Sequence, residues 1–358
     1  MPRDPISCYS VTEISAPARY GARRMTRPTD ANSLNRRTAL WGAAALALAP
    51  FTRAADPLGA VAQDVASLGA PDSALEAKIA ALAAEAGLPK VGFAAVDIAK
   101  GRTAFVRGGE LFPMSGLNGL PVAIAFLKLV QDGAARLDAR IHLKAADIVP
   151  GRSPIGDRLR KRPTMFTSRQ LIEHVLLNND TTATDALVKL AGGTAGIAAV
   201  LKRFDIQGLR IDRSERELAR DTGNLNDKAA LDRYLADPRD TVSPRAMATL
   251  LVKLQSGHLL QPRFVLLVTE LMRRTKLGDD RLKGGFVPGW SFAHRASSPR
   301  SIEGATLGFH DAGLANGKGG TKIALAIMIE RATLSPAELA QFHRATARAV
   351  LQDWGQSS

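Results

Sequence analysis

The chain is 358 residues long, 46% of its residues are hydrophobic, and its formal net charge is +14. This length and composition indicate a globular protein with a sizeable core. Only 5% of the residues are aromatic, and no stacking motif accompanies the densest basic run, residues 158–162, so we do not expect nucleic-acid binding. We interpret that run as the solvated rim of a loop, with an anion-binding lip as the alternative.

The first 55 residues have the pattern of a twin-arginine export signal. Arg36 and Arg37 precede a short apolar run, residues 39–50, which small residues follow. The run has about a dozen residues, whereas a spanning helix needs about 20. We therefore expect a cleaved signal, no membrane span and a periplasmic or secreted protein. A disordered basic tail on a cytosolic protein is the alternative.

The translation start is open between Met1 and Met25, because Met25 begins a conventional signal sequence. The only cysteine, Cys8, lies upstream of Met25. We therefore expect a mature protein without a thiol, a disulfide or a cysteine metal ligand. Residues 1–55 contain eight arginines and three acidic residues, and the rest of the chain stays basic.

A helix and a β-hairpin are predicted after the leader. Ser73–Glu76 has the form of a capping box, and apolar residues continue at helical spacing as far as Gly87. Residues 91–98 and 103–106 have strand character and are joined through Lys100-Gly101. This arrangement predicts a hairpin.

The segment before the apolar stretch 122–130 carries a serine that lacks a base. Pro121 is tolerated only in a first helical turn, so the helix is predicted to begin with Asn118 as its N-cap, and Ser115 lies before it. A serine hydroxyl needs an adjacent base at neutral pH, and neither Asn118 nor Gly119 can accept its proton. The segment is either a buried helix with a glycine-rich start or the floor of a ligand site.

From there to about residue 285 the signals are helical, and no strand pattern competes with them. Helix starts are predicted at Thr167, Thr194, Ser243-Pro244 and Gln261-Pro262.

Strand character returns at residues 290–295, where an apolar face alternates with a polar one. His294 falls on the face expected to point into the core. Residues 304–309 and 322–329 predict two more strands, and a capping box at Ser335–Glu338 opens a final helix.

This order of elements predicts an α+β fold. An antiparallel sheet is built from both chain ends and flanked by helices, with an inserted all-helical domain. We expect a leader at 1–55, a discontinuous sheet domain at 72–111 plus 286–358, and the helical domain at 112–285.

Four motifs make residues 72–356 resemble the class A β-lactamases, a family of penicillin-recognising serine hydrolases. Phe112-Pro113-Met114 is similar to the start of the family's central helix, where S-x-x-K supplies a serine nucleophile and an activating lysine. The spacing from Phe112 to Asp132-Gly133 equals that of the family, so Gly116 stands at the serine position and Gly119 at the lysine position. The resemblance implies the family's fold with its nucleophile and base missing.

Two further motifs are altered. At the family's S-D-N motif this chain has Asn179, Asp180 and Thr181, which implies ligand-binding positions at Asn179 and Thr181 and a helix N-cap at Asp180. The K-T-G strand motif begins here with Arg295 and ends with Ser297. Both are expected on a polar face that lines the cleft, where Arg295 keeps the positive charge and Ser297 narrows the space.

The fourth motif is similar to the family's Ω-loop. Glu215 matches the glutamate that activates deacylating water, but the asparagine that usually accompanies it is replaced by Ala219. Residues 239–241 resemble the far end of the loop, where an aspartate pairs with an arginine. About a dozen additional residues predict an enlarged loop, 213–241, that covers the cleft. A surface carboxylate on a long loop is the alternative for Glu215.

On this resemblance we expect an exported class A β-lactamase-like pseudoenzyme. It would bind a small anionic ligand, β-lactam or muropeptide-like, or a protein partner, through Asn179, Thr181, Arg295 and Ser297. The alternative is an active divergent β-lactamase or other serine hydrolase that uses Ser115 or a water activated by Glu215. The histidines show no metal-ligand spacing, so we expect no metal, no cofactor and a monomer.

Overall fold

The computed structural model describes residues 71–355, apart from 224, 226 and 298–300. The predicted export signal and Cys8 lie outside these residues. Within them no single helix is long and apolar enough to cross a membrane, although one bent pair, Thr181–Leu190 with Gly193–Arg203, has the necessary length and composition together.

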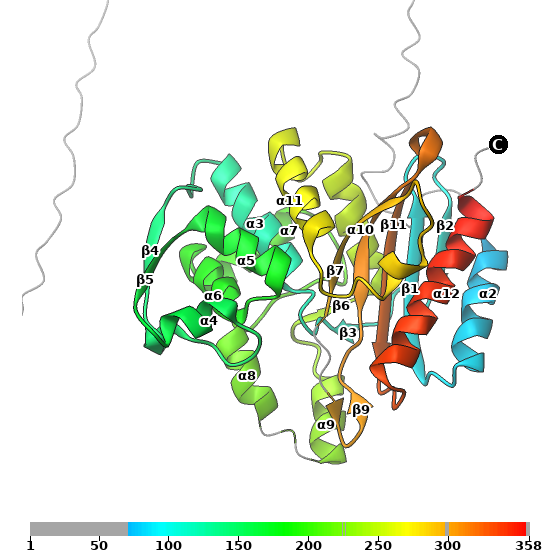
Figure 1. Ribbon diagram of the computed structural model, residues 1–358, viewed down its shortest axis with the longest axis horizontal. Helices are drawn as coiled ribbons and strands as arrows, with labels where there is room; N and C mark the ends of the chain where they lie inside the picture. Colours follow the sequence, from blue (N-terminus) through cyan, green and yellow to red (C-terminus); the bar gives the residue numbers. More distant parts are fainter. Residues whose placement is uncertain (1–70, 224, 226, 298–300, 356–358) are drawn as a thin grey trace, which may run out of the picture. The chain divides into compact units, whose positions relative to one another are not determined.

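The described part of the chain contains a five-stranded antiparallel sheet made from both of its ends (Figure 1). The strand order is β2-β1-β11-β10-β7, so the N-terminal hairpin pairs directly with the C-terminal strands. The bounds are β1 Lys90–Asp97, β2 Thr103–Val106, β7 Ser291–Ala296, β10 Asp311–Asn316 and β11 Lys322–Glu330. The predicted fold class is therefore confirmed.

Helices cover both faces of this sheet. On one face α2 (Ser73–Glu85) and α12 (Pro336–Trp354) bury large side chains such as Phe93 and Trp354 (Figure 1). On the other face α10 (Pro244–Gln255) packs against β1, β10 and β11. The approach is close because β1 carries Gly92, where a Cβ atom would lie 2.6 Å from Pro244 Cγ.

Among the remaining helices α3 is central: its first nine residues are all buried, and it contacts α5, α6 and α7. Their bounds are α3 Gly119–Gln131, α4 Pro154–Leu159, α5 Ser168–Asn178, α6 Thr181–Leu190, α7 Gly193–Arg203, α8 Glu215–Gly223, α9 Lys228–Ala236 and α11 Pro262–Arg274. Short pairs of strands join this region: β3 Phe112–Pro113 with β6 Thr241–Val242, β4 Arg140–Leu143 with β5 Thr164–Thr167, and β8 Ser301–Ile302 with β9 Ala305–Thr306. Within the described residues the 3₁₀ turns are η2 Ala145–Asp147, η3 Leu282–Gly285 and η4 Lys318–Gly320.

Most predicted helix starts are confirmed. Asn118 occupies the N-cap position of α3, with Pro121 in the first turn. Thr167 caps α5 in a capping box with Gln170, and the box at Ser335–Glu338 caps α12. The starts at Thr167 and Ser335 were predictable because a capping box joins residues only three positions apart.

Two predicted starts were wrong by one position. The N-cap of α2 is Asp72, which accepts from Leu75 N, whereas Glu76 accepts from Phe105 N of the neighbouring strand. The cap of α7 is Gly192 in the left-handed conformation, so that helix begins at Gly193 and not at Thr194.

The prediction that residues 112–285 contain no strands was also wrong, because the strand pairs β3–β6 and β4–β5 lie there. The strand expected at 304–309 is displaced: only Ala305–Thr306 pairs, in the short β8–β9 hairpin, and the sheet strand is β10. The sequence of β10 does not show a clear strand pattern because it contains Asp311, a charged residue that is buried and pairs with His294 inside the sheet. The predicted boundary between the two domains stays a prediction.

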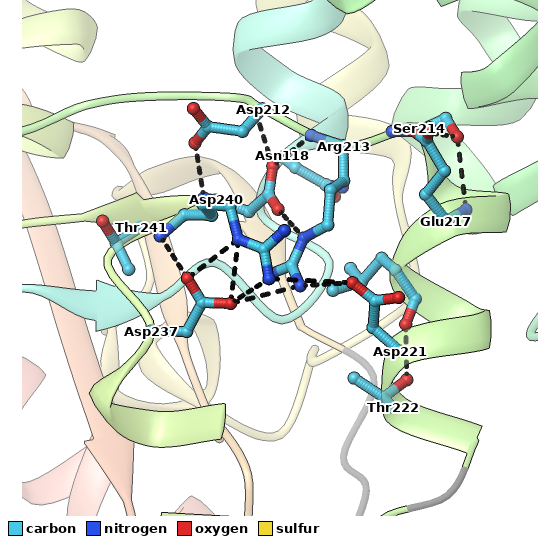
Figure 2. Close-up of polar contacts among 12 residues, drawn as sticks. Asn118, Asp212, Arg213, Ser214, Glu217, Asp221, Thr222, Asp237, Asp240 and Thr241 are labelled. Carbon is cyan, nitrogen blue, oxygen red and sulfur yellow. Dashed lines mark hydrogen bonds and ion pairs between the residues drawn. The ribbon is translucent and has the colours of Figure 1, made fainter. Parts of the chain in front are cut away.

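The loop predicted at 213–241 contains two helices, α8 and α9, anchored at one buried arginine (Figure 2). Arg213 Nε lies 2.5 Å from Asp240 Oδ2. The prediction expected an aspartate paired with an arginine at the loop's far end without naming the arginine. Arg213 Nη1 lies 2.9 Å from Asp221 in α8 and 3.3 Å from Asp237, just after α9. One guanidinium therefore joins both helices to the base of the loop.

Replacement of Arg213 by alanine should destabilise the protein by about 3 kcal/mol, because three carboxylates lose a cation that is only 6% exposed. Arg210→Ala is the matched control. Arg210 is 52% exposed and pairs with Asp212 at the surface, so its loss should cost less than about 1 kcal/mol. Urea denaturation of both variants measures the difference, and equal losses would contradict the anchoring role of Arg213.

Candidate functional site

A cavity of about 560 Å³ lies between α3, the start of α6, α8, α9 and β7. Of the predicted site residues, Ser115, Asn179, Thr181, Glu215 and Arg295 line it, and so does Gly116. The sequence motifs therefore meet at one place. Gly119 and Ser297 are not among its lining residues.

The floor of the cavity has an unusual backbone before α3. Ser115 and Gly116 both have positive φ angles, +45° and +96°. A backbone hydrogen bond fixes this segment to the far end of the enlarged loop: Met114 N donates to Asp240 O at 3.0 Å. The Ser115 hydroxyl is buried and has no hydrogen-bond partner among the described residues. It therefore lies before the helix, as predicted, and does not face a base.

His310 is the nearest candidate base, since a Cβ atom at Gly308 would contact both Ser115 Oγ and His310 Nε2, but it cannot activate the hydroxyl. Its Nε2 lies 2.8 Å from Pro113 O, and its Nδ1 accepts from Ile329 N at 3.1 Å, so the ring proton is held on Nε2. Burial lowers the pKa of His310 to about 3, and the ring is neutral at ordinary pH. With one nitrogen donating and the other accepting, no lone pair is left for a serine proton.

Arg295 does not project into the cavity as an exposed cation. Its side chain is buried, and its guanidinium donates to the carbonyls of Gly116, at 3.2 Å, and Val175. A Cβ atom at Gly119 would clash with Arg295 Nη2 and would lie 2.9 Å from Val175 Cγ1. Arg295 therefore fills the space that a side chain at position 119 would need.

Glu215 is the acidic group of the cavity. It is the first residue of α8, and Asp185 accepts from its backbone N at 2.6 Å and from Arg216 N at 3.1 Å. Asn118 Nδ2 donates to Glu215 Oε1 at 2.6 Å. Burial raises the pKa of Glu215 to about 7, while the hydrogen bond from Asn118 opposes the shift. The carboxyl thus titrates close to neutral pH.

Arg295 and Glu215 influence each other electrostatically. Burial lowers the pKa of Arg295 to about 9, and the negative charge of Glu215 opposes that shift. The buried cation is thus stabilised by two carbonyls and by a carboxyl that is itself only partly ionised near neutral pH.

The two positions of the altered S-D-N motif line the cavity next to Asp180. Asn179 adopts the left-handed conformation at the end of α5, and its Nδ2 donates to Ala296 O of β7 at 2.9 Å. Asp180 caps α6 by accepting from Ala183 N, as predicted. The Thr181 hydroxyl donates to the carbonyls of Val149 and Arg152 at 3.3 and 3.4 Å.

The prediction that Ser297 narrows the cleft is not met. Its hydroxyl is fully buried, accepts from His310 N at 2.8 Å and donates to Gly308 O at 3.2 Å. Ser297 also donates its backbone N–H to His310 O at 3.0 Å, so it continues the pairing with the strand segment before β10 and is not a lining residue of the cavity. His294 does point into the core, as predicted, with Nδ1 2.9 Å from Asp311 Oδ1.

Sequence reasoning missed three residues that shape this site. Asn118 was identified only as a helix cap, yet it supplies the amide for Glu215 that Ala219 cannot provide. Asp185 orients the start of α8, and Tyr234 lines the cavity from α9. The replacement of an amide by Ala219 was the available signal, because a buried carboxyl needs a donor.

Among the described residues no group of three or more His, Cys, Asp or Glu side chains could hold a metal ion.

Comparison with known proteins agrees with this geometry. The sequence matches the beta-lactamase enzyme family over residues 74–354. A β-lactamase from Chitinophaga pinensis has a TM-score of 0.70 at 23% identity and covers 78% of this chain and 99% of its own. A PBP-A mutant, solved as an acyl-enzyme complex with penicillin G, has a TM-score of 0.67 at 23% identity, with 80% and 98% covered.

An ancestral class A β-lactamase is also similar, with a TM-score of 0.68, 27% identity, and coverage of 78% of this chain and all of its own. The family match spans well over half of the chain, and these structures share its sheet and helices over nearly their whole length. The chain therefore belongs to the beta-lactamase enzyme family, a serine hydrolase family, and has the fold of the class A β-lactamases.

Proposed function

We propose that the protein is an exported β-lactamase-like pseudoenzyme that binds a small anionic ligand without forming an acyl-enzyme. The observation that carries this proposal is the position of Arg295. Its guanidinium occupies the volume next to Gly119 in which the family's lysine base would lie. A lysine at this position would have to displace a buried cation from two backbone carbonyls.

The backbone at Gly116 supports the same proposal. Its φ of +96° lies in a region that residues with a side chain rarely adopt. A serine there would be strained, and it would have no base beside it. Because nucleophile and base act as a unit, the loss of both lowers the rate by orders of magnitude.

The charge of the cavity supports an anionic ligand. Two arginines, Arg152 and Arg295, line it against one acid, Glu215. Since the pKa of Glu215 is about 7, its negative charge is only partly present at neutral pH. Arg152 is exposed at the rim, where its Nε donates to Asn178 O at 2.7 Å, so a carboxylate can reach the other guanidinium nitrogens. The alternative to a small anionic ligand is a protein partner, which binding experiments can also detect.

A second candidate function rests on Glu215 itself. A carboxyl that titrates near pH 7 beside a cavity is suited to act as a general base toward water, without a serine nucleophile. In that case the protein would hydrolyse its ligand directly. Loss of turnover in Glu215→Gln, with ligand binding intact, would distinguish this candidate from the pseudoenzyme.

The purified protein should neither hydrolyse a chromogenic cephalosporin nor gain mass on incubation with a penicillin. The double variant Gly116→Ser with Gly119→Lys should also be inactive, because the introduced lysine would clash with Arg295 and the introduced serine would adopt a strained φ. Addition of Arg295→Lys should relieve the clash but not the strain. Intact-mass spectrometry measures acyl-adduct formation in the wild type, the double variant and the triple variant. An adduct mapped to Ser115 of the wild type would contradict the proposal.

The stability of the protein should depend on Glu215 between pH 4.5 and 7. In this window the folded state retains a proton that the unfolded chain releases, so stability falls as pH rises from 4.5 to 7. Glu215→Gln lacks this dependence and should gain up to about 3 kcal/mol relative to wild type between pH 5 and pH 8. Urea denaturation of both proteins at pH 5 and pH 8 measures this change in relative stability. His310 titrates in both proteins, so its contribution cancels. A difference that does not change with pH would contradict the raised pKa.

Export is proposed on the pattern at Arg36 and Arg37, which lies outside the described residues. Replacement of both arginines by lysine should trap the precursor in the cytoplasm, because the twin-arginine route depends on that pair. Cell fractionation compares the periplasmic yield of the two forms. An unchanged yield would favour the general secretory route.

A further inference from the structure

The two-stranded ribbon β4–β5 lies at the margin of the helical region and has two unlike faces (Figure 1). Its register pairs Ile141 with Phe166 and His142 with Met165, so alternate residues point to opposite sides. Leu143 and Phe166 are buried in the core cluster of the helical region, whereas His142 and Met165 are exposed. The core therefore fixes the ribbon through one face and leaves the other face in contact with solvent.

The exposed face of the ribbon is basic. Arg140, His142 and Lys144 occupy alternate positions, and all three are exposed. Lys144 keeps extended backbone angles, φ −134° and ψ 175°, so the alternation continues past the end of β4. Lys161 and Arg162, which are also exposed, lead into β5 at the end of the ribbon where Lys144 leaves β4. We call these five residues the basic face.

The charges of the basic face are not neutralised within the protein. Neighbouring arginines do have carboxylate partners: the pairs are Arg136–Asp138, Arg160–Asp157 and Arg169–Glu173. In the part of the chain that the structure describes, no ion pair involves a residue of the basic face. Asp147, three residues after Lys144, is half-buried and accepts from Lys144 N at 2.9 Å. The positive charge of the face is therefore available to an external anion.

The spacing of these charges favours an array of anions over a single one. Arg140 and Lys144 are four residues apart on extended backbone, which places them about 13 Å from each other. A single carboxylate or phosphate group is too small to contact both. Met165, which is 51% exposed, lies opposite His142 among the cations. An apolar side chain flanked by basic residues is typical of a surface that contacts the headgroup region of a bilayer.

We propose that the basic face holds the protein on the surface of a bilayer that contains anionic phospholipids. Each lysine or arginine close to such a surface strengthens binding about fivefold. The formal net charge of the chain, +14, adds a long-range attraction of the same sign. Among the residues that line the cavity, none belongs to the basic face, so this proposal is independent of the proposed ligand.

Vesicle binding by a charge-reversal variant tests the proposal. The purified full chain should sediment with vesicles of phosphatidylcholine and phosphatidylglycerol at about 0.1 M salt, but not with phosphatidylcholine alone. Salt at about 1 M should release it, because the Debye length then falls to about 3 Å. The triple variant Arg140→Glu/Lys144→Glu/Lys161→Glu should bind on the order of a hundredfold more weakly.

A matched control makes the same change of charge at exposed positions of the sheet domain. It is the triple variant Lys318→Glu/Lys322→Glu/Arg348→Glu, which replaces two lysines and one arginine as well. This control should lose less than about a tenth as much affinity as the variant of the basic face, because its residues do not touch the bilayer.

A local measurement separates the basic face from residues 1–55, which are also basic. A polarity-sensitive fluorophore attached in Met165→Cys, in a chain that also carries Cys8→Ser, should shift its emission to shorter wavelength when phosphatidylglycerol vesicles are added. The same fluorophore attached in Lys318→Cys, in an exposed turn before β11, should show no shift.

Each contrary outcome overturns the proposal. These outcomes are absence of binding by the wild type, unchanged binding by the basic-face variant, equal losses in both triple variants, and absence of an emission shift at position 165. Binding of soluble polyglutamate without binding of vesicles would assign the face to an acidic protein instead. If the charge reversal lowers the urea midpoint, Arg140→Gln/Lys144→Gln/Lys161→Gln replaces it.

Discussion

The buried guanidinium of Arg295 is the interaction on which the architecture of the site depends. It connects β7 to the entry of α3 through Gly116 O and to α5 through Val175 O. A cation this deeply buried must be compensated, and two carbonyls together with the negative charge of Glu215 do so. Gly119 is the complementary requirement, because any larger residue would displace the guanidinium.

The environment of Glu215 is linked to the buried charge of Arg295. Glu215 is desolvated, and its amide donor is Asn118, the N-cap of α3. In the class A pattern the glutamate's asparagine lies four residues further along the loop, at the position of Ala219. The donor has thus moved from the loop to the helix entry. A shifted donor leaves α8 free to present Leu218 and Ala219 to the cavity as apolar surface.

Local signals explain what could be predicted from the sequence. Caps such as Thr167 with Gln170 depend on neighbours in the chain, and the pairing of Asp240 with an arginine followed from a recognisable loop motif. The register that placed Gly116 and Gly119 at the nucleophile and base positions is consistent with a site at the foot of α3. What the sequence did not reveal depends on packing across long separations. Arg295 was expected on a cleft-lining face, and strand alternation cannot tell a side chain in the cleft from one donating to Val175 O, 120 residues away. The strand β10 escaped detection because its buried Asp311 is paired with His294.

These dependencies couple the residues at the family's nucleophile and base positions to the packing around them. A lysine at position 119 is incompatible with Arg295, and the loss of Arg295 alone would leave the carbonyls of Gly116 and Val175 without their donor and Glu215 without its counter-charge. Each single substitution toward the family's residues is therefore expected to cost stability. The packing around Arg295 therefore holds the site in its present form. Leu218 lines the cavity from α8, so a substitution there would change the cavity at a position outside the contacts of Arg295.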